Sequence, residues 1–272
     1  RHMAAPSLAD VVDALEGRYP VTTAAEWDAV GLVCGDPAMT VSSILWAVDP
    51  TSVVVDEAID AGVDLVITHH PLFLTGVHSV AATDAKGRVV HRLLESGIAL
   101  YCAHTNADVA HPGVSDALAA ALGLGDLVPL DPSGLGCVGT IDPAVSLADF
   151  AAQVAAALPS THHGVRVAGD TAHLVRRVAV CGGSGDGLLV CATAAGADVY
   201  VTADLKHHRT LEHLEDGGCA LIDVAHWASE WPWLAQAAVL LEADLAIQGS
   251  TVGSIVSAAP TDPWAMSIRG AH

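Results

Sequence analysis

The feature that most constrains this chain is a repeated alternation of short apolar runs and helical segments. Apolar runs of strand character at 42–50, 63–71 and 98–103 alternate with segments of helical spacing at 51–62 and 87–97. This alternation is typical of parallel strands, because a parallel connection must cross back over the sheet, usually as a helix. The sequence therefore predicts an α/β fold with mostly parallel, mixed sheets.

The alternation occurs twice, which predicts two lobes. Between the two series, residues 125–143 are rich in Gly, Pro and Asp, a composition typical of a junction. We expect an N-terminal α/β lobe over 4–124, a linker over 125–143 and a C-terminal α/β lobe over 144–272. The two residues before Met3 resemble a remnant of an affinity tag and are excluded from this reasoning.

The net charge and the length of the apolar runs argue against nucleic acid and membrane as partners. The net charge is -20, with 31 acidic residues against 11 Lys and Arg, and such a surface repels phosphate backbones and anionic lipids. This argues against direct nucleic-acid binding. No apolar run reaches the roughly 18 residues that cross a bilayer, and six cysteines without CxxC spacing are typical of reduced thiols. We expect a cytoplasmic protein without a membrane partner.

Polar residues collect where the predicted strands end, which is where open α/β sheets bind their ligands. His69 and His70 come directly after the strand in 63–71, and Pro71 follows them. Imidazole nitrogen is a common ligand of divalent transition metals. The pair is therefore either a set of metal ligands or a capping pair at the surface.

Two further pairs are spaced four residues apart after predicted strands. His104 and Asp108 follow one strand, and His226 and Glu230 follow another. If a helix starts near His226, the spacing places His226 and Glu230 on one face, where both can coordinate one metal ion. The alternatives are an ordinary turn for the first pair and a solvated surface pair for the second.

Weaker signals lie in the second half. Asp204, Lys206 and His208 follow a strand and either support a site or cap a helix. The Gly-rich segment 182–187 either cradles a phosphate on backbone N–H groups or forms a plain tight turn. It lacks the Lys-Ser/Thr ending of a P-loop, which favours the turn.

Together these segments resemble the GTP cyclohydrolase type 2 homologue family, also called the NGG-one-interacting-factor-three family of dinuclear metal proteins. The matching segments appear in the family's order and cover nearly the whole chain. They are EWDAVGLVCGD (26–36), ITHHPLFL (67–74), AHTNAD (103–108), GGSG (182–185), GADVYVTADLKHH (196–208) and LIDVAHWASE (221–230).

The resemblance implies two α/β lobes with a dinuclear metal site in the cleft between them, and a toroidal homohexamer. Longer family members carry an inserted middle domain, for which this chain is too short. The implied ligands of two divalent ions (Zn, Fe, Mn, Ni or Co) are His69, His70, Asp108, His226 and Glu230. Glu230 would bridge the ions, with His70 and Asp108 on one and His69 and His226 on the other.

The activity implied by the family name is a metal-dependent hydrolase that acts on GTP, with His104 or His208 as general acid or base. A nucleotide or phosphoester hydrolase on the same five ligands is the first alternative. A hexameric metal-binding scaffold or regulator without enzymatic activity is the second. One fold hosts many functions, so the sequence leaves these three open.

Overall fold

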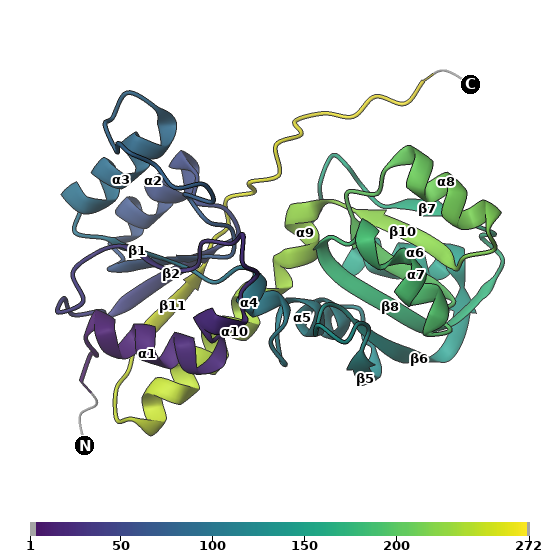
Figure 1. Ribbon diagram of the computed structural model, residues 1–272, viewed down its shortest axis with the longest axis horizontal. Helices are drawn as coiled ribbons and strands as arrows, with labels where there is room; N and C mark the ends of the chain where they lie inside the picture. Colours follow the sequence, from purple (N-terminus) through teal and green to yellow (C-terminus); the bar gives the residue numbers. More distant parts are fainter. Residues whose placement is uncertain (1–3, 271–272) are drawn as a thin grey trace. The chain divides into compact units, whose positions relative to one another are not determined.

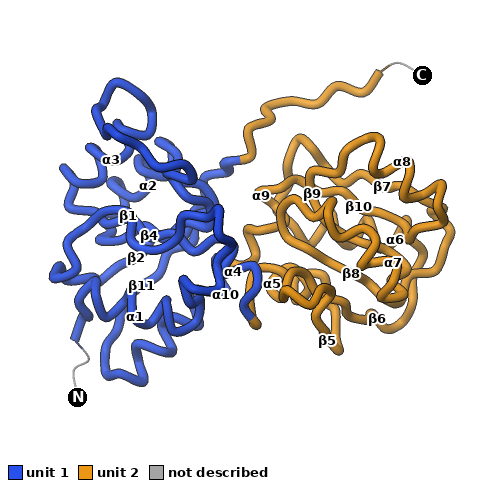
Figure 2. Tube along the Cα trace, in the orientation of Figure 1, with its two compact units in different colours: residues 1–110, 234–261 blue, residues 111–233, 262–272 orange. Residues whose placement is uncertain are grey.

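A computed structural model describes residues 4–270, and the chain divides into two compact units (Figure 2). The first unit comprises 1–110 with 234–261, and the second comprises 111–233 with 262–272. Each unit is a mixed sheet packed with helices, which confirms the predicted α/β class and its two lobes. The tag-like residues before Met3 lie outside the described residues.

The first unit is built on a five-stranded sheet in the order β1-β4-β3-β2-β11. The neighbours β4, β3, β2 and β11 run parallel, and β1 pairs antiparallel with β4 at the edge. The strands are β1 (Gly31–Cys34), β2 (Ser43–Ala47), β3 (Leu65–Thr68), β4 (Ala99–Cys102) and β11 (Gly253–Val256). Because β3 and β4 are buried along their whole length, they are continuous apolar runs in the sequence.

Helices cover both faces of this sheet (Figure 1). Helices α2 and α3 pack on one face through Val54, Val55 and Val89, and α1 and α10 lie on the other. A capping box of Ser7 and Asp10 starts α1, and Gly62 ends α2 with a φ of 64°. The helices are α1 (Leu8–Arg18), η1 (Val21–Thr23), α2 (Ser52–Ala61), α3 (Ala85–Glu95), α4 (Thr105–Asp108) and α10 (Pro232–Ile247).

The second unit is built on a six-stranded sheet in the order β5-β6-β8-β9-β10-β7. The central strands β8, β9 and β10 are parallel, and β5, β6 and β7 pair antiparallel. The strands are β5 (Gly125–Pro129), β6 (Cys137–Ser146), β7 (Arg166–Ala168), β8 (Leu174–Ser184), β9 (Val199–Ala203) and β10 (Ala220–Val224). Its helices are α5 (Val114–Ala121), α6 (Leu147–Ala157), η2 (Asp186–Leu188), α7 (Leu189–Ala194), α8 (His207–Glu215) and α9 (His226–Glu230).

One segment differs from the expectation drawn from the sequence. The segment 125–143, expected to be a linker, holds β5 and the start of β6, and its Gly and Pro residues make the hairpin turn between them. After β10 the chain forms two successive helices, α9 and α10, because Pro232 has no N–H with which to continue the hydrogen bonding of α9. The closing strand β11 pairs with β2, so the last strand of the chain belongs to the first unit.

The six cysteines of the chain all lie within the described residues. All six cysteines are free, three of them buried and three half-buried. Burial raises the pKa of the Cys137 thiol to about 12, so this side chain is a packing group rather than a nucleophile. Among the described helices, none combines the length and the apolar character that crossing a bilayer requires.

Candidate metal centre

In the first unit, three histidines gather at the carboxyl ends of two neighbouring parallel strands. His69 and His70 follow β3, and His104 follows β4 two residues after that strand ends. One ring nitrogen from each histidine lies within 4.8 Å of the others. His69 is fully buried, and the other two are half-buried. Three imidazoles this close form a donor group suited to a divalent transition metal.

Each of these rings is oriented by an acceptor at its Nδ1 atom. Nδ1 of His69 lies 2.9 Å from the carbonyl oxygen of Ala103, and Nδ1 of His70 lies 2.7 Å from Oδ1 of Asp49. A carbonyl oxygen only accepts hydrogen bonds, so His69 donates from Nδ1 and its neutral ring keeps the lone pair on Nε2. This arrangement, with the other ring nitrogen held by an oxygen, is the usual state of a metal-ligating histidine.

Asp108 adds a carboxylate to the same unit. It is the last residue of the short helix α4, which starts directly after His104. Its Oδ1 lies 3.5 Å from Nε2 of His69. Two acceptor atoms that face each other at this distance attract only when a proton or another cation lies with them. The structure thus brings together the sequence-predicted His69, His70 and Asp108.

His104 is held by a carboxylate that the sequence analysis did not single out. Asp28 has a fully buried side chain, and its Oδ1 lies 2.8 Å from Nδ1 of His104. Burial opposes the charge of Asp28, but hydrogen bonds from Thr105 and His104 outweigh burial and lower the pKa of Asp28. Burial and the neighbouring His69 lower the pKa of His104. Nε2 of a neutral His104 therefore accepts a proton while Asp28 holds Nδ1.

In the second unit, His226 and Glu230 lie on one turn of α9, at the carboxyl end of β10. Nε2 of His226 is 3.0 Å from Oε1 of Glu230, and the Glu230 side chain is buried. The i, i+4 spacing therefore produces the shared face that the sequence predicts. A buried carboxylate beside an imidazole is costly unless a cation neutralises it, so this pair also suits a metal ion.

His226 has its own orienting carboxylate, in the same pattern as the first unit. Its Nδ1 lies 2.6 Å from Oδ2 of Asp204, which follows β9. The hydrogen bond from His226, helped by one from Ser184, lowers the pKa of Asp204 to about 2 despite partial burial. Asp204 has a φ of 58°, a left-handed conformation that costs about 1 kcal/mol or more outside glycine. The turn stores this strain while it presents the carboxylate to His226.

The Gly-rich segment packs against this pair. Gly183 has a φ of 72°, and a Cβ there would lie 2.5 Å from Oε1 of Glu230 and 3.2 Å from Nε2 of His226. Its N–H donates to Oγ of Ser229 and its carbonyl accepts from Thr202, so its backbone groups are used within the protein. The segment therefore acts as a tight turn that makes room for two donors, rather than as a phosphate cradle.

We predict that Gly183→Ala weakens metal binding about 10–100-fold, the range seen when groups that orient ligands are changed. The added methyl group must displace Glu230 or His226, and the left-handed backbone disfavours alanine. Gly187→Ala is the matched control in the same turn, since no atom lies within 4 Å of its Cβ position. Competition with a fluorescent chelator measures both affinities, and equal values for the two variants would contradict the prediction.

His208, the second candidate proton carrier, lies on an exposed part of α8. Its ring contacts the ring of His207, with centroids 5.0 Å apart. Lys206 precedes the helix and is also exposed. The catalytic role of His208 stays a prediction. Asp49 follows β2 directly, so the strand-end rule could have found it, whereas Asp28 lies in a loop that carries no such signal.

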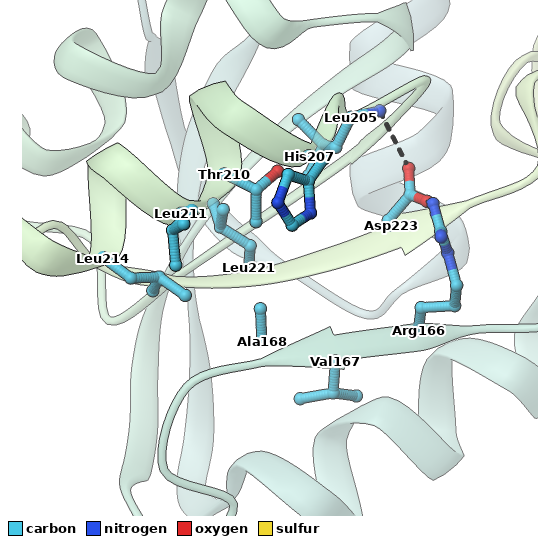
Figure 3. A pocket seen from close by; sticks show the side chains of 10 residues that line it. All are labelled: Arg166, Val167, Ala168, Leu205, His207, Thr210, Leu211, Leu214, Leu221 and Asp223. Carbon is cyan, nitrogen blue, oxygen red and sulfur yellow. Dashed lines mark hydrogen bonds and ion pairs between the residues drawn. The ribbon is translucent and has the colours of Figure 1, made fainter.

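A pocket of about 430 Å³ in the second unit has none of these donors in its lining, which Figure 3 shows. Asp223 and Arg166 meet at one end of it, and α8 contributes apolar side chains such as Leu211. Asp223 accepts hydrogen bonds from Arg166, from the backbone N–H of Leu205 and from His163. Its charge is therefore satisfied within the protein, and the pocket adds no donor to the candidate centre.

The fold and these donors define a class: a mixed α/β protein whose histidine and carboxylate groups, at the ends of parallel strands, suit divalent cations. The family model described as Duf34/NIF3 (NGG1p interacting factor 3) matches residues 6–263. The chain belongs to this family.

Relatives with similar sequences carry one name. A protein of Streptomyces coelicolor, named GTP cyclohydrolase 1 type 2 homolog, is 48% identical over 98% of this chain and 96% of its own length. A protein of the same name from Mycobacterium leprae is 36% identical over 96% of each chain. Its alignment spans 374 positions, so it carries residues that this chain of 272 lacks.

Solved structures share the fold. The Bacillus cereus protein related to NIF3 has a TM-score of 0.89 and covers 97% of this chain and 100% of its own, at 24% identity. A Staphylococcus aureus hypothetical protein has a TM-score of 0.87 at 32% identity, and covers 95% of this chain and 98% of its own. The two-unit α/β architecture is therefore the fold of this family.

Proposed function

We propose that this protein binds two divalent metal ions and uses them to hydrolyse a nucleotide, with GTP as the first substrate to test. The observation that carries the proposal is that three histidines have the same hydrogen-bond arrangement at Nδ1. Nδ1 of His69, His70 and His226 each lies against an oxygen acceptor, the arrangement in which a histidine binds a metal ion through Nε2. The name of the relatives, GTP cyclohydrolase 1 type 2 homolog, supports the choice of GTP.

The proposed ligands supply a donor set that fits such ions. The first unit supplies His69, His70 and Asp108, and the second supplies His226 and Glu230. Mixed imidazole and carboxylate donors suit Zn, Fe, Mn, Ni or Co. When bound, two such ions lower the pKa of a coordinated water toward neutrality and polarise the group under attack.

The chain's own residues would then manage orientation and proton transfer. Asp49 and Asp204 hold the rings of His70 and His226, so these ligands need no reorganisation when a substrate arrives. His104 would accept a proton at Nε2 as the general base, because burial keeps its ring neutral and Asp28 stabilises the imidazolium that forms. His208 is the alternative proton carrier in this proposal.

Turnover of GTP tests the activity. The metal-loaded protein and its Glu230→Ala variant are incubated with GTP, and products are separated by chromatography. Product from the wild type that exceeds the variant by about 100-fold or more would support the proposal, since removal of one strongly interacting group in a site commonly costs this much. Equal product from both proteins would end it. Nucleoside monophosphates and short phosphodiesters in the same panel test the alternative phosphoester hydrolase.

The assembly and the location are part of the proposal and rest on the family resemblance. We propose a homohexameric ring in the cytoplasm. Light scattering coupled to size-exclusion chromatography measures the mass in solution. A mass of about six chains is expected, and a monomer at all concentrations would contradict it.

A further inference from the structure

A pocket of about 490 Å³ in the first unit lies at the carboxyl ends of β2 and β3. It has the size of a small-molecule site. One wall contains His70, a proposed metal ligand, and Asp49, which orients it. The opposite wall is α3, which contributes Lys86, Arg88 and Arg92. The pocket thus adjoins the candidate metal centre from within one unit.

The concentration of positive charge here is unusual for this chain. Only 11 Lys and Arg stand against 31 acidic residues, and three of the 11 line this one pocket. Arg88 and Arg92 are four residues apart on one face of α3, a spacing at which like charges repel and destabilise a helix. The arrangement costs stability, and a bound anion would remove that cost.

The three basic side chains differ in whether they pair with an acidic group. Arg92 pairs with the exposed Asp56 of α2. Arg88 reaches only the carbonyl oxygen of Ala82, at 3.5 Å, and Lys86 forms no ion pair with a carboxylate among the described residues. Two of the three positive charges on this wall therefore face the pocket without an acidic partner.

The N-terminus of α2 also lines the pocket and adds partial positive charge to it. Pro50, Thr51 and Ser52 line the pocket, and the helix N-terminus carries partial positive charge on its backbone N–H groups. Thr51 is the N-cap residue, yet its side chain makes no capping hydrogen bond. Its Oγ1 is buried and has no hydrogen-bond partner in the part of the chain that the structure describes. Because this oxygen has no accessible surface, the backbone N–H groups at the start of α2, rather than the Thr51 hydroxyl group, are what this wall offers a ligand.

We propose that this pocket binds the phosphate groups of a phosphorylated small-molecule substrate whose reacting part lies at the His70 side. The proposal rests on the proposed function and names the substrate class of that site. Several phosphate oxygens match two cations without an acidic partner and a helix N-terminus. The polyphosphate chain of a nucleotide supplies this charge in a ligand small enough for the pocket.

The test measures binding of inorganic tripolyphosphate to the full-length, metal-stripped protein by isothermal titration calorimetry. The double variant Lys86→Ala/Arg88→Ala is expected to bind about tenfold or more weakly, because two charge-assisted contacts are lost. Arg176→Ala is the matched control, since Arg176 is an exposed cation of the second unit that pairs with Asp142. Circular dichroism and thermal melting verify that each variant is folded, and Lys86→Arg/Arg88→Lys, which keeps both charges, is expected to retain most of the binding.

Each outcome decides one claim. The proposal that this pocket binds phosphate groups would be overturned by either of two results. One is equal affinity of the wild type and the double variant for tripolyphosphate, and the other is no binding to the wild type at millimolar concentration. If citrate binds as tightly as tripolyphosphate, and the double variant loses both, the assignment of the pocket to phosphate groups would be overturned. Because the protein is metal-stripped, the result does not depend on turnover. A chain that binds tripolyphosphate but hydrolyses no nucleotide would refute the proposed activity alone.

Discussion

A His70→Ala variant is expected to retain fewer than about one metal ion per chain, against about two in the wild type. The imidazole of His70 lies with those of His69 and His104, and Asp49 already holds its Nδ1. Removal of this ring deletes a donor and leaves the carboxylate of Asp49 without the partner that orients it. Elemental analysis of protein purified without a polyhistidine tag measures the metal content directly.

His91→Ala is the matched control for this experiment, since His91 is an exposed histidine on α3. It makes the same chemical change away from the proposed ligands, so its metal content should equal that of the wild type. The same loss in both variants would show that metal binds to the histidine-rich surface in general. Wild-type content in His70→Ala would remove His70 from the ligand set.

The second large effect concerns stability. Trp46→Ala is expected to lower the free energy of unfolding of the first unit by about 3–5 kcal/mol. Trp46 lies in the interior strand β2 with no exposed surface, and its Nε1 donates to Oγ of Ser254 in the edge strand β11, at 3.2 Å. The substitution leaves a large cavity beneath the sheet and removes a link between β2 and the strand that closes it.

Urea denaturation followed by circular dichroism measures this change. Trp264→Ala removes the same side chain from a position that is 64% exposed, and its effect is expected to stay within about 0.5 kcal/mol. Since each unit has its own core, two transitions can occur, and the one that shifts in Trp46→Ala reports the first unit. Equal shifts in both variants would contradict the assignment of Trp46 to the core.

The proposed phosphate pocket and the candidate metal ligands of the first unit depend on one structural feature, the parallel arrangement of β2, β3 and β4. Their carboxyl ends deliver Asp49, His70 and His104 to one edge of the sheet. Since the peptide chain leaves each strand at that edge, loops and helix starts gather there without interrupting the core. A substrate bound by α2 and α3 would therefore lie beside the histidines without any conformational change in the first unit.

Local patterns in the sequence determined much of this protein. Strand and helix periodicity predicted the alternating strands and helices of the first lobe, and the strand-end rule found the histidines after β3 and β4. These features depend on neighbours a few residues away, because hydrogen bonding within a helix and side-chain alternation along a strand are short-range.

Only the tertiary structure decided which distant groups meet. Asp28 reaches His104 across 76 positions of sequence, and β11 pairs with β2 after the chain has passed through the whole sheet of the second unit. The pocket lined by Lys86, Arg88 and Arg92 likewise combines the start of α2 with residues of α3. Such contacts are selected by the packing of complete elements, and the free energy of that packing is not encoded in any short stretch of residues.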